Sequence, residues 1–503
     1  MAASDMPREP QSPAELSAVL RKLREAMLDA ERRDVPDEPR VDPVHHEGAR
    51  NLVHYLAFRK NDVRPLQQGL VRLGLSSLGR SEAHILPSVD QLLSLLDPHD
   101  SSGRFSPGDA SSDPASAIDE AQDRLRANTD RALGPRPAGR RTRIMVTMPT
   151  EAARKPEFVR ELLKRGMDCA RINTAHDNEA AWKAMVHNIR SEAEAAGREC
   201  RILMDLPGPK LRTGPQPSGK AGKINLQVGD HLILMADLEA AAKPPPAGSL
   251  PYVGCTLPDV LERLRPGERV WFDDGKIGAE AIKVGGGEAE LEVTAAPRGG
   301  TRLRGEKGIN VPDTDLHLSS PTPDDLANLP FVAANADLVG MSYVQRPADV
   351  HRLHEELRRL GAEHVGVVLK IESAKAFARL PSIVLAAMEY PVAAVMIARG
   401  DLAVEIGWER MAEVQEEILW LAEAAHIPVI WATQMLASLA KTGLPSRAEI
   451  TDAAMSGRAE CAMLNKGPYI GEAVSTLDDI LRRMSTHQDK KASLLRGLRA
   501  WYT

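Results

Sequence analysis

Polar side chains follow several short apolar runs in the second half of the chain, and the clearest case reads "VMIARGDLAVEI". There the apolar run ends on Arg399, Gly400 and Asp401. A second run, "VGVVLKIE", ends on Lys370 and Glu372, whose alternate positions would point both side chains to the same side of a strand. Carboxylates with room for water and substrate oxygens suit Mg²⁺. The pattern therefore predicts a divalent-cation site shared by Glu372 and Asp401.

Each of these features also has a plainer interpretation. Lys370 and Glu372 could form a salt-bridged strand end, and Asp401 could be the N-cap of a helix. A capped helix start would not exclude ligand binding. Gly400 allows the backbone to approach a ligand closely, and the first amide groups of a helical turn suit a carboxylate or phosphate.

The elements that must position these residues are short buried strands separated by amphipathic helices. Near-continuous Val, Ile and Met runs are typical of parallel strands buried on both faces. The runs occupy residues 143–148, 169–174, 201–206, 336–343, 365–372, 392–400, 428–435 and 460–465. Eight such units predict a (β/α)8 TIM barrel, in which the carboxyl ends of the strands form the active face. Those ends carry Thr147, Arg171, Asn173, His176, Asp205, Lys370, Glu372, Arg399, Asp401 and Thr433.

The longest gap between predicted strands falls after the third one. It holds segments such as "KINLQVGDHLILM" and "EAELEVTAA", whose apolar residues alternate in period two between turn residues. This pattern predicts a small all-β domain inserted into the barrel. We expect a helical N-terminal region at 1–96, a linker and leading helix at 97–140, the first barrel part at 141–214, the inserted β lid domain at 215–302, the second barrel part at 303–488 and a C-terminal tail at 489–503.

Composition narrows the class of protein. A length of 503 residues predicts more than one domain. The net charge of −6 is small and argues against a dedicated nucleic-acid binder. No apolar leader and no uninterrupted apolar span are present, and the four cysteines form no CxxC pair. We expect a cytoplasmic protein with reduced thiols and no membrane segment.

Seven motifs together resemble the pyruvate kinase family. They are "CARINTAH", "MDLPGPKLRTG", "FDDGKI", "EKGINVP", "KIES", "IARGDLAVEI" and "WATQMLASLAKTGLPSRAEITDAA". They follow one another in the family's order over roughly residues 140–485, with the β insert where the family has it. The resemblance implies phosphoryl transfer from phosphoenolpyruvate to ADP, yielding pyruvate and ATP, with Mg²⁺ or Mn²⁺ as cofactor.

The resemblance also implies roles for individual residues on the substrate side. Lys370 corresponds to the lysine that stabilises the phosphoryl group in flight, and Arg171 to an arginine that binds phosphate. Thr433 corresponds to the threonine linked to protonation of the enol carbon. Glu372 and Asp401 correspond to the metal-binding carboxylates, and Gly400 with Asp401 would offer amides to the substrate carboxylate.

On the other side of the implied site lie nucleotide and monovalent-cation contacts. Thr147, Arg171, His176 and Lys307 correspond to nucleotide-binding positions. Asn173, Asp205 and Leu206 correspond to the site of a monovalent cation.

The chain departs from the family pattern at the monovalent-cation site. Ala175 stands where the family usually has serine, and Lys210 stands where it usually has glutamate. An ammonium group can replace a potassium ion, so we predict that K⁺ is not required. The plainer alternative for Lys210 is a surface lysine.

Other departures concern loops and whole segments. The loops at 147–152 and 464–470 are shortened, and Pro207 replaces a lysine. The resemblance ends before the family's C-terminal domain, which carries a sugar-phosphate effector site and a subunit interface, so we expect no control by that route. A homo-oligomer could instead form through the barrel or the N-terminal helices.

Two other functions remain open at this point. The altered nucleotide-side loops favour a metal-dependent lyase or aldolase acting on an enolisable 2-oxo acid, whereas the retained "FDDGKI" motif disfavours it. The third interpretation is a catalytically silent regulatory binding protein whose helical N-terminus contacts a partner. The intact Lys370, Glu372, Asp401 and Thr433 disfavour that alternative.

Overall fold

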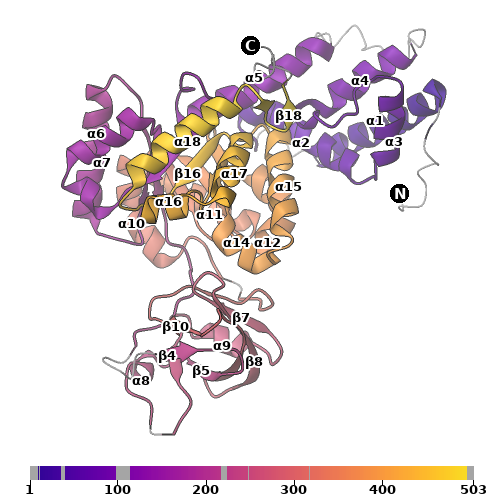
Figure 1. The fold of residues 1–503 in the computed structure, drawn as a ribbon. Coiled ribbons are helices and arrows are strands. Elements are labelled where there is room, and N and C mark those ends of the chain that lie inside the picture. The colour runs from indigo at the N-terminus through magenta and orange to yellow at the C-terminus, as the bar shows by residue number, and fades with distance from the viewer. Residues whose placement is uncertain are drawn as a thin grey trace.

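The computed structural model describes residues 10, 12–34, 40–97, 114–216, 224–246, 248–316 and 318–494. Within these ranges the chain forms a barrel with a β domain at one end and a helical region at the other (Figure 1). Residues 98–113 of the predicted linker and residues 495–503 of the predicted tail lie outside the described residues. The predicted architecture is confirmed: a TIM barrel, an all-β insert and a helical N-terminal region.

Eight parallel strands close the barrel in the order β1-β16-β15-β14-β13-β12-β3-β2. Their bounds are β1 Arg143–Thr147, β2 Cys169–Asn173, β3 Arg201–Asp205, β12 Leu338–Met341, β13 Gly366–Ile371, β14 Ala393–Ala398, β15 Val429–Ala432 and β16 Cys461–Leu464. Each lies inside one of the predicted apolar runs. All residues of these strands are buried except two in β2 and one in β3, as expected for strands covered on both faces.

Helices cover the outside of the barrel and connect its strands. They are α6 Pro156–Arg165, α7 Glu179–Ala195, α10 Pro323–Asn335, α11 Pro347–Arg359, α12 Ala374–Ala378, α13 Leu380–Ala387, α14 Arg399–Ile406, α15 Met411–Ala424, α16 Ala437–Thr442, α17 Arg447–Met455 and α18 Ile470–Met484. Local sequence sets several of their starts. The Asn178 side chain accepts the Ala181 amide at the start of α7, and Thr322 forms a capping box with Asp325 at the start of α10.

The insert leaves the barrel after β3, as predicted, and returns before β12. It contains β4 Ile224–Leu226, β5 His231–Met235, α8 Leu238–Ala241, β6 Tyr252–Gly254, α9 Asp259–Arg263, β7 Arg269–Phe272, β8 Ile277–Gly285, β9 Glu288–Ala295, β10 Thr301–Leu303 and β11 Ile309–Asn310. Its six-stranded sheet has the order β11-β7-β8-β9-β5-β6 and its own hydrophobic core. The sheet extends past the predicted boundary at 302, because Ile309 in β11 pairs with Phe272 in β7. A two-residue strand is too short to show alternation in the sequence.

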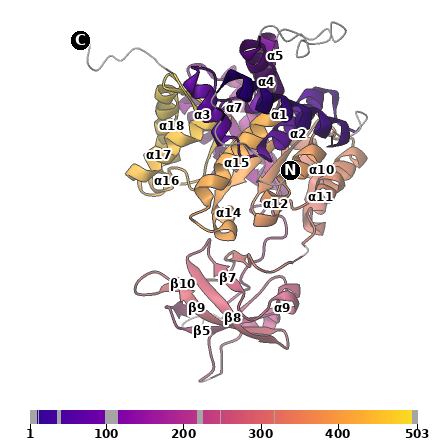
Figure 2. The ribbon, with the colours of Figure 1, turned by 90° about the vertical axis from the view of Figure 1, so that its right-hand side faces the viewer.

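The N-terminal region packs against the amino ends of the barrel strands, opposite the insert (Figure 2). It comprises α1 Pro13–Asp34, α2 His46–Arg59, α3 Arg64–Arg72, α4 Ile85–Leu96 and α5 Pro114–Leu133, with short 3-10 turns η1 Pro43–His45 and η2 Glu82–His84. Leu20, Leu52 and Ile418, from α1, α2 and α15, belong to one hydrophobic core that continues into the barrel's helical shell.

Buried hydrogen bonds tie this region to the barrel base. The Asn51 amide donates to the carbonyl oxygens of Ala424 at 2.7 Å and Glu82 at 2.8 Å. The Asn128 amide donates to the His426 carbonyl at 2.8 Å, and the His426 ring nitrogen lies 2.7 Å from the Ala83 carbonyl. A small hairpin, β17 Gln488–Asp489 and β18 Ala492–Ser493, adjoins the same base.

Two further expectations bear on the class of protein. No helix in the described ranges combines the length and the apolar character needed to cross a membrane. The four cysteines, Cys169, Cys200, Cys255 and Cys461, are buried free thiols, as predicted. Burial raises the pKa of Cys200 to about 12, so that thiol stays protonated and unreactive at neutral pH.

Candidate active site

A buried lysine lies at the centre of the carboxyl ends of the barrel strands. The Lys370 ammonium, at the end of β13, is 3.1 Å from Glu372 Oε1 and 3.3 Å from Asp205 Oδ2. It also donates to Ser342 Oγ at 2.5 Å. Lys370, Glu372 and Asp205 are 8%, 3% and 0% exposed. This is the salt-bridged arrangement considered from the sequence, but it includes a second carboxylate from a separate strand.

The opposite charges in this cluster stabilise one another in their ionised forms. Burial alone would lower the pKa of Lys370, but Asp205 and Glu372 outweigh it and raise that pKa above its usual value. Burial would raise the pKa of Asp205, yet Lys370 and Arg171 hold it below its usual range. Lys370 and Asp205 are therefore both charged at neutral pH.

Arg171, on β2, links this cluster to an open cavity. Its guanidinium donates to Asp205 Oδ2 from two nitrogens, one of them at 2.9 Å, and to Thr147 Oγ1 at 3.1 Å. The cavity beside it has a volume of about 300 Å³, and its lining includes Thr147, Arg171, Asn173, His176, Asn465 and Lys466. Burial, followed by the nearby charge of Lys466, lowers the pKa of His176, which favours a neutral imidazole at neutral pH.

The second predicted carboxylate, Asp401, is paired with a different lysine. Lys210 Nζ lies 2.9 and 3.0 Å from the two oxygens of Asp401, and the Tyr343 hydroxyl lies 3.4 Å from one of them. The Tyr343 amide donates to Glu372 Oε2 at 2.7 Å. Burial raises the pKa of Glu372; Lys370 opposes this shift and Asp401 adds to it. Glu372 and Asp401 are thus near enough to act on each other electrostatically.

The segment "ARGD" forms the start of α14, as expected, but Asp401 is not its N-cap. Ala398 occupies the N-cap position, and Asp401 directs its carboxylate to Lys210 instead. The capped-start interpretation of Asp401 is therefore wrong. The Gly400 amide donates to Thr433 Oγ1 at 2.8 Å, so the two predicted substrate-binding residues contact each other.

Thr433 is held in an unusual backbone conformation. Its φ is +66°, a left-handed value that is rare for a β-branched residue. Arg399 donates to the Thr433 carbonyl at 2.7 Å and to Asp452 Oδ2 at 2.8 Å, and its guanidinium lies over the Trp431 ring. Arg399 therefore positions the Thr433 loop, which accounts for an arginine at the end of a buried strand. Backbone strain of this kind is common at functional sites.

The remaining predicted residues occupy two places. Asn173 and Asp205 are register partners at the ends of β2 and β3, and Leu206 follows directly. Asn173 Oδ1 accepts the Ala175 amide at 3.1 Å. Lys307 lies on the insert, where its ammonium is 3.0 Å from Asp273 Oδ1.

Several residues of this face were missed by the sequence analysis. Gly340 leaves space for Asp205, because a Cβ there would lie 2.4 Å from Asp205 Oδ1. Ser342 and Tyr343 follow β12, and Asn465 and Lys466 follow β16. Reading the polar residues at the ends of these two strands would have identified all four, as it did for the other strands.

Oxygen ligands for a hard cation are present. The carboxylates of Glu372 and Asp401 each contact a lysine, which a bound cation could replace. Asp205 Oδ1 is buried without a hydrogen-bond partner among the described residues. No cluster of three or more His, Cys, Asp or Glu side chains that could hold a metal occurs in the described ranges. The pair of carboxylates fits Mg²⁺, which rarely takes an all-protein cage.

The barrel and the insert are similar in sequence to known proteins. Residues 139–474 match the family model described as pyruvate kinase, barrel domain. The chain is 33% identical to the pyruvate kinase of Corynebacterium efficiens over 355 residues, which covers 69% of this chain and 70% of the relative. It is 34% identical to that of Mycobacterium intracellulare over 350 residues, 68% and 70% of the two chains.

A third relative is similar over about the same share of this chain but over less of its own length. The pyruvate kinase of Bacillus licheniformis is 31% identical over 351 residues, which covers 68% of this chain and 57% of the relative. The matched residues 139–474 contain the barrel strands, the insert and the lysine–carboxylate cluster described above. The chain belongs to the pyruvate kinase family.

Proposed function

We propose that this protein transfers the phosphoryl group of phosphoenolpyruvate to ADP, producing pyruvate and ATP. The observation that carries the proposal is the arrangement of Lys370 and Arg171 on the shared carboxylate of Asp205, beside an open cavity. Phosphoryl transfer depends mainly on positioning and charge neutralisation. A buried ammonium and a guanidinium held in place before the substrate arrives supply both.

The roles of the two cations follow from their partners. The raised pKa of Lys370 keeps its ammonium charged, so it can neutralise the phosphoryl oxygens as the group moves. Arg171 presents a planar guanidinium that suits phosphate. Asp205 holds both side chains in position and is a positioning residue in this scheme.

Glu372 and Asp401 would hold the Mg²⁺ or Mn²⁺ ion. When bound there, the ion would neutralise phosphoryl oxygens that the two cationic side chains do not reach. Lys210 now contacts both oxygens of Asp401. Its ammonium must move aside before Asp401 can accept another cation, so Lys210 would compete with the metal.

Thr433 is suited to delivering the proton to the enol carbon. Its Oγ1 accepts the Gly400 amide, which leaves the hydroxyl proton free to be donated. The strained backbone and the Arg399 contacts hold this hydroxyl at the carboxyl end of β15. We propose that the proton reaches the substrate from, or by way of, Thr433.

The cavity beside Arg171 is the proposed nucleotide side. Thr147, His176 and Arg171, which the resemblance assigns to nucleotide binding, line it, and Lys466 adds a cation from the shortened loop after β16. Lys307 would reach this side from the insert. A neutral His176 can donate or accept a hydrogen bond to a nucleotide without adding charge.

The insert meets the barrel where it could cover the site. A Cβ on Gly275, in the "FDDGKI" turn, would lie 3.0 Å from both Trp408 and Val404, and the Asn310 amide lies 3.4 Å from Glu405 Oε1. These contacts join the insert to α14, which begins with Arg399, Gly400 and Asp401, and to the turn that follows it. We propose that the insert acts as a lid and excludes water during transfer.

We also propose that K⁺ is not required. Asp205 already has two cationic partners, Lys370 and Arg171, and Ala175 lacks the hydroxyl that the family usually provides. The Lys210 ammonium contacts Asp401 in this structure, so it would replace a monovalent charge near the metal ligands.

The test is pyruvate release from phosphoenolpyruvate with Mg²⁺, with and without ADP and with and without K⁺. We expect release that depends on ADP and Mg²⁺ and changes little when K⁺ is omitted. Release without ADP would indicate a lyase-type reaction instead. Strong activation by K⁺ would contradict the proposed role of Lys210.

A substitution at Lys210 sharpens the potassium test. Lys210→Glu restores the residue usual in the family and removes the ammonium from Asp401. We expect this variant to gain a dependence on K⁺, with wild-type protein measured in the same salts as control. A variant that loses activity equally in every salt would show that Lys210 has another role.

A further inference from the structure

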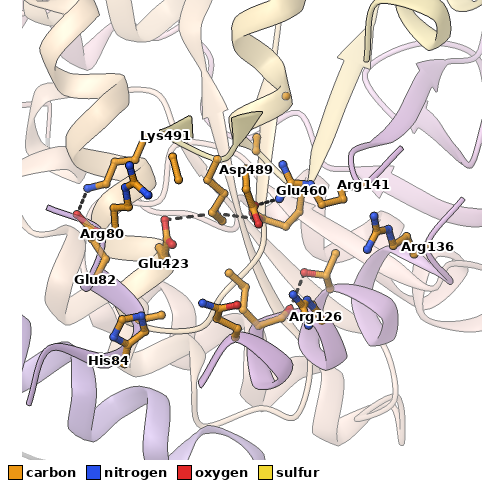
Figure 3. A pocket seen from close by; sticks show the side chains of 18 of the residues that line it. Arg80, Glu82, His84, Arg126, Arg136, Arg141, Glu423, Glu460, Asp489 and Lys491 are labelled. Atoms are coloured by element: carbon orange, nitrogen blue, oxygen red, sulfur yellow. Dashed lines mark hydrogen bonds and ion pairs between the residues drawn. The ribbon is translucent and has the colours of Figure 1, made fainter. Parts of the chain in front are cut away.

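A second cavity lies at the base of the barrel, at the opposite end from the proposed active site. Its volume is about 380 Å³, which is within the range of small-ligand sites. Four parts of the chain form it: η2 and α5 of the N-terminal region, the segment between α5 and β1, residues 457–460 before β16, and hairpin β17–β18 with the end of α15. We call it the base chamber (Figure 3).

Every described carboxylate that lines the base chamber is engaged in an ion pair. Lys490 Nζ lies 2.8 Å from Glu460 Oε1 and 3.5 Å from Glu423 Oε2. The other pairs are Lys491 with Glu82, Arg141 with Asp489 and Arg143 with Asp130. These five carboxylates therefore hold four of the cations and have little capacity for more.

The cations of the chamber outnumber its carboxylates. Among the described residues, seven lysine or arginine side chains line it against five aspartates and glutamates, an excess of two positive charges. Arg80 and Arg136 make no ion pair with any described carboxylate, and both are exposed. Arg126 pairs with Asp123, which is not part of the lining. The excess is notable in a chain whose net charge is −6.

Three arginines of the chamber lie close together on one wall. Figure 3 shows Arg126, Arg136 and Arg141 on one side of the chamber and Arg80 with Lys491 on the other. Burial lowers the pKa of Arg141, and the charges of Arg136 and Arg126 add to this effect against that of Glu460. Like charges crowded in this way disfavour one another, and a bound anion would relieve the repulsion.

We infer that the base chamber binds a compact organic dianion of the phosphate monoester class. Such a group carries close to two negative charges at neutral pH, which matches the excess of the lining. A guanidinium group can donate two parallel hydrogen bonds to the oxygens of one phosphate. Ala83, Leu125 and Leu494 provide apolar surface for the carbon part of the ligand. The inference does not depend on the reaction proposed above.

Binding can be measured with glycerol 2-phosphate, a simple phosphate monoester, by titration calorimetry on the full chain at constant ionic strength. We expect saturable binding to wild-type protein. Arg80→Ala/Arg136→Ala should weaken it at least about tenfold, because each hydrogen bond to a charged group contributes substantially. Arg483→Ala removes an arginine that is 74% exposed on α18, outside the lining, and should leave the affinity unchanged.

A second variant separates charge from geometry. Arg80→Lys/Arg136→Lys keeps both charges but removes the planar forks, and we expect an intermediate affinity. Because these residues are exposed and lack carboxylate partners among the described residues, circular dichroism should show native folding of both double variants. Hydrogen exchange should slow at residues 80–84 and 488–493 when glycerol 2-phosphate binds to wild-type protein.

Three results would overturn the inference. The first is an absence of saturable binding. The second is equal affinity in wild-type protein and Arg80→Ala/Arg136→Ala, since the ligand would then occupy another site such as the catalytic mouth. The third is equally tight binding of inorganic phosphate through the same arginines, which would make the chamber a site for free phosphate and not for its esters.

Discussion

Each end of the barrel holds a lysine between two carboxylates, but the two lysines have different surroundings. At the mouth, Lys370 lies 3.3 Å from Asp205 and 3.1 Å from Glu372, next to an open cavity. At the base, Lys490 lies 2.8 Å from Glu460 and 3.5 Å from Glu423. The same local pattern is used at both ends.

The difference lies in what else the carboxylates contact. At the mouth, Asp205 also holds Arg171, and Glu372 also accepts the Tyr343 amide, so each keeps a partner if the lysine engages a substrate. At the base, Glu460 also accepts the Val429 amide at 2.9 Å, but Glu423 has no salt bridge among the described residues except the one with Lys490. Lys370 is therefore free to change partners during a reaction, whereas Lys490 joins the hairpin to the barrel.

The largest expected effect comes from Lys370→Met. We expect turnover to fall by at least about 10²–10³-fold, the usual cost of removing one preorganised hydrogen-bond donor from an oxyanion hole. Steady-state pyruvate release measures the loss, and circular dichroism checks the fold. Activity close to that of wild type would show that the mouth lysine is structural, and the contrast between the two ends would disappear.

The same substitution at the base should lower stability and leave turnover unchanged. Lys490→Met leaves Glu423 and Glu460 facing each other without their shared cation, and breaking a buried pair costs about 3–5 kcal/mol. The side chain is 20% exposed, so the lower end of that range is expected. Urea denaturation gives the stability, and turnover per folded molecule should stay near wild type. Equal stability of both proteins would contradict the role assigned to Lys490.

Glu405 tests whether charge near the mouth costs stability. Burial raises its pKa to about 7 from 4.5, with the Asn310 contact opposing the change. Between these values the folded protein binds a proton that the unfolded chain has lost, so stability falls as pH rises from 4.5 to 7.

Glu405→Gln removes this ionisation. The variant should match wild type near pH 5 and exceed it at pH 8 by up to about 3 kcal/mol, since each tenfold change in proton affinity corresponds to ~1.4 kcal/mol. Urea denaturation at both values measures the effect. Glu413→Gln, which replaces a 58% exposed carboxylate on α15, serves as control. A variant less stable than wild type at pH 8 would show that the ionised carboxylate has a stabilising partner.

The smallest expected effect concerns space at the mouth. A Cβ on Gly340 would lie 2.4 Å from Asp205 Oδ1, so Gly340→Ala should destabilise the protein by about 1–3 kcal/mol and displace the carboxylate that holds Lys370 and Arg171. Gly285→Ala is the control, because nothing lies within 4 Å of a Cβ there. If both variants melt at the same temperature, Asp205 is less tightly confined than the geometry indicates.

The mouth was largely predictable from sequence, for a physical reason. Buried parallel strands appear as apolar runs, and the residues that end them must gather at one face. This logic identified Lys370, Glu372, Asp401 and Thr433 before any contact was known, and the family motifs added a role for Arg171. It did not identify Gly340, whose importance depends on its distance from an atom on another strand.

The base chamber could not be predicted in the same way. Its lining comes from positions as far apart as Arg80, Arg141 and Lys491, and no periodicity links an interhelical turn to a C-terminal hairpin. The partner of Lys210 is a similar case. The sequence indicated that Lys210 could replace a monovalent cation. It did not indicate the contact with Asp401, which depends on the path of the segment that leads into the insert. Local patterns predict elements, whereas contacts between distant segments require the fold.

The attachment of the N-terminal helices has a consequence for how the chain can be divided. Asn51 and Asn128 donate to the carbonyls of Ala424 and His426, which lie between the end of α15 and the start of β15. Cutting the chain before β1 would expose these carbonyls and the apolar surface around them. In calorimetry the helices and the barrel should therefore melt as one cooperative unit, and a barrel expressed alone should be recovered mainly as aggregate.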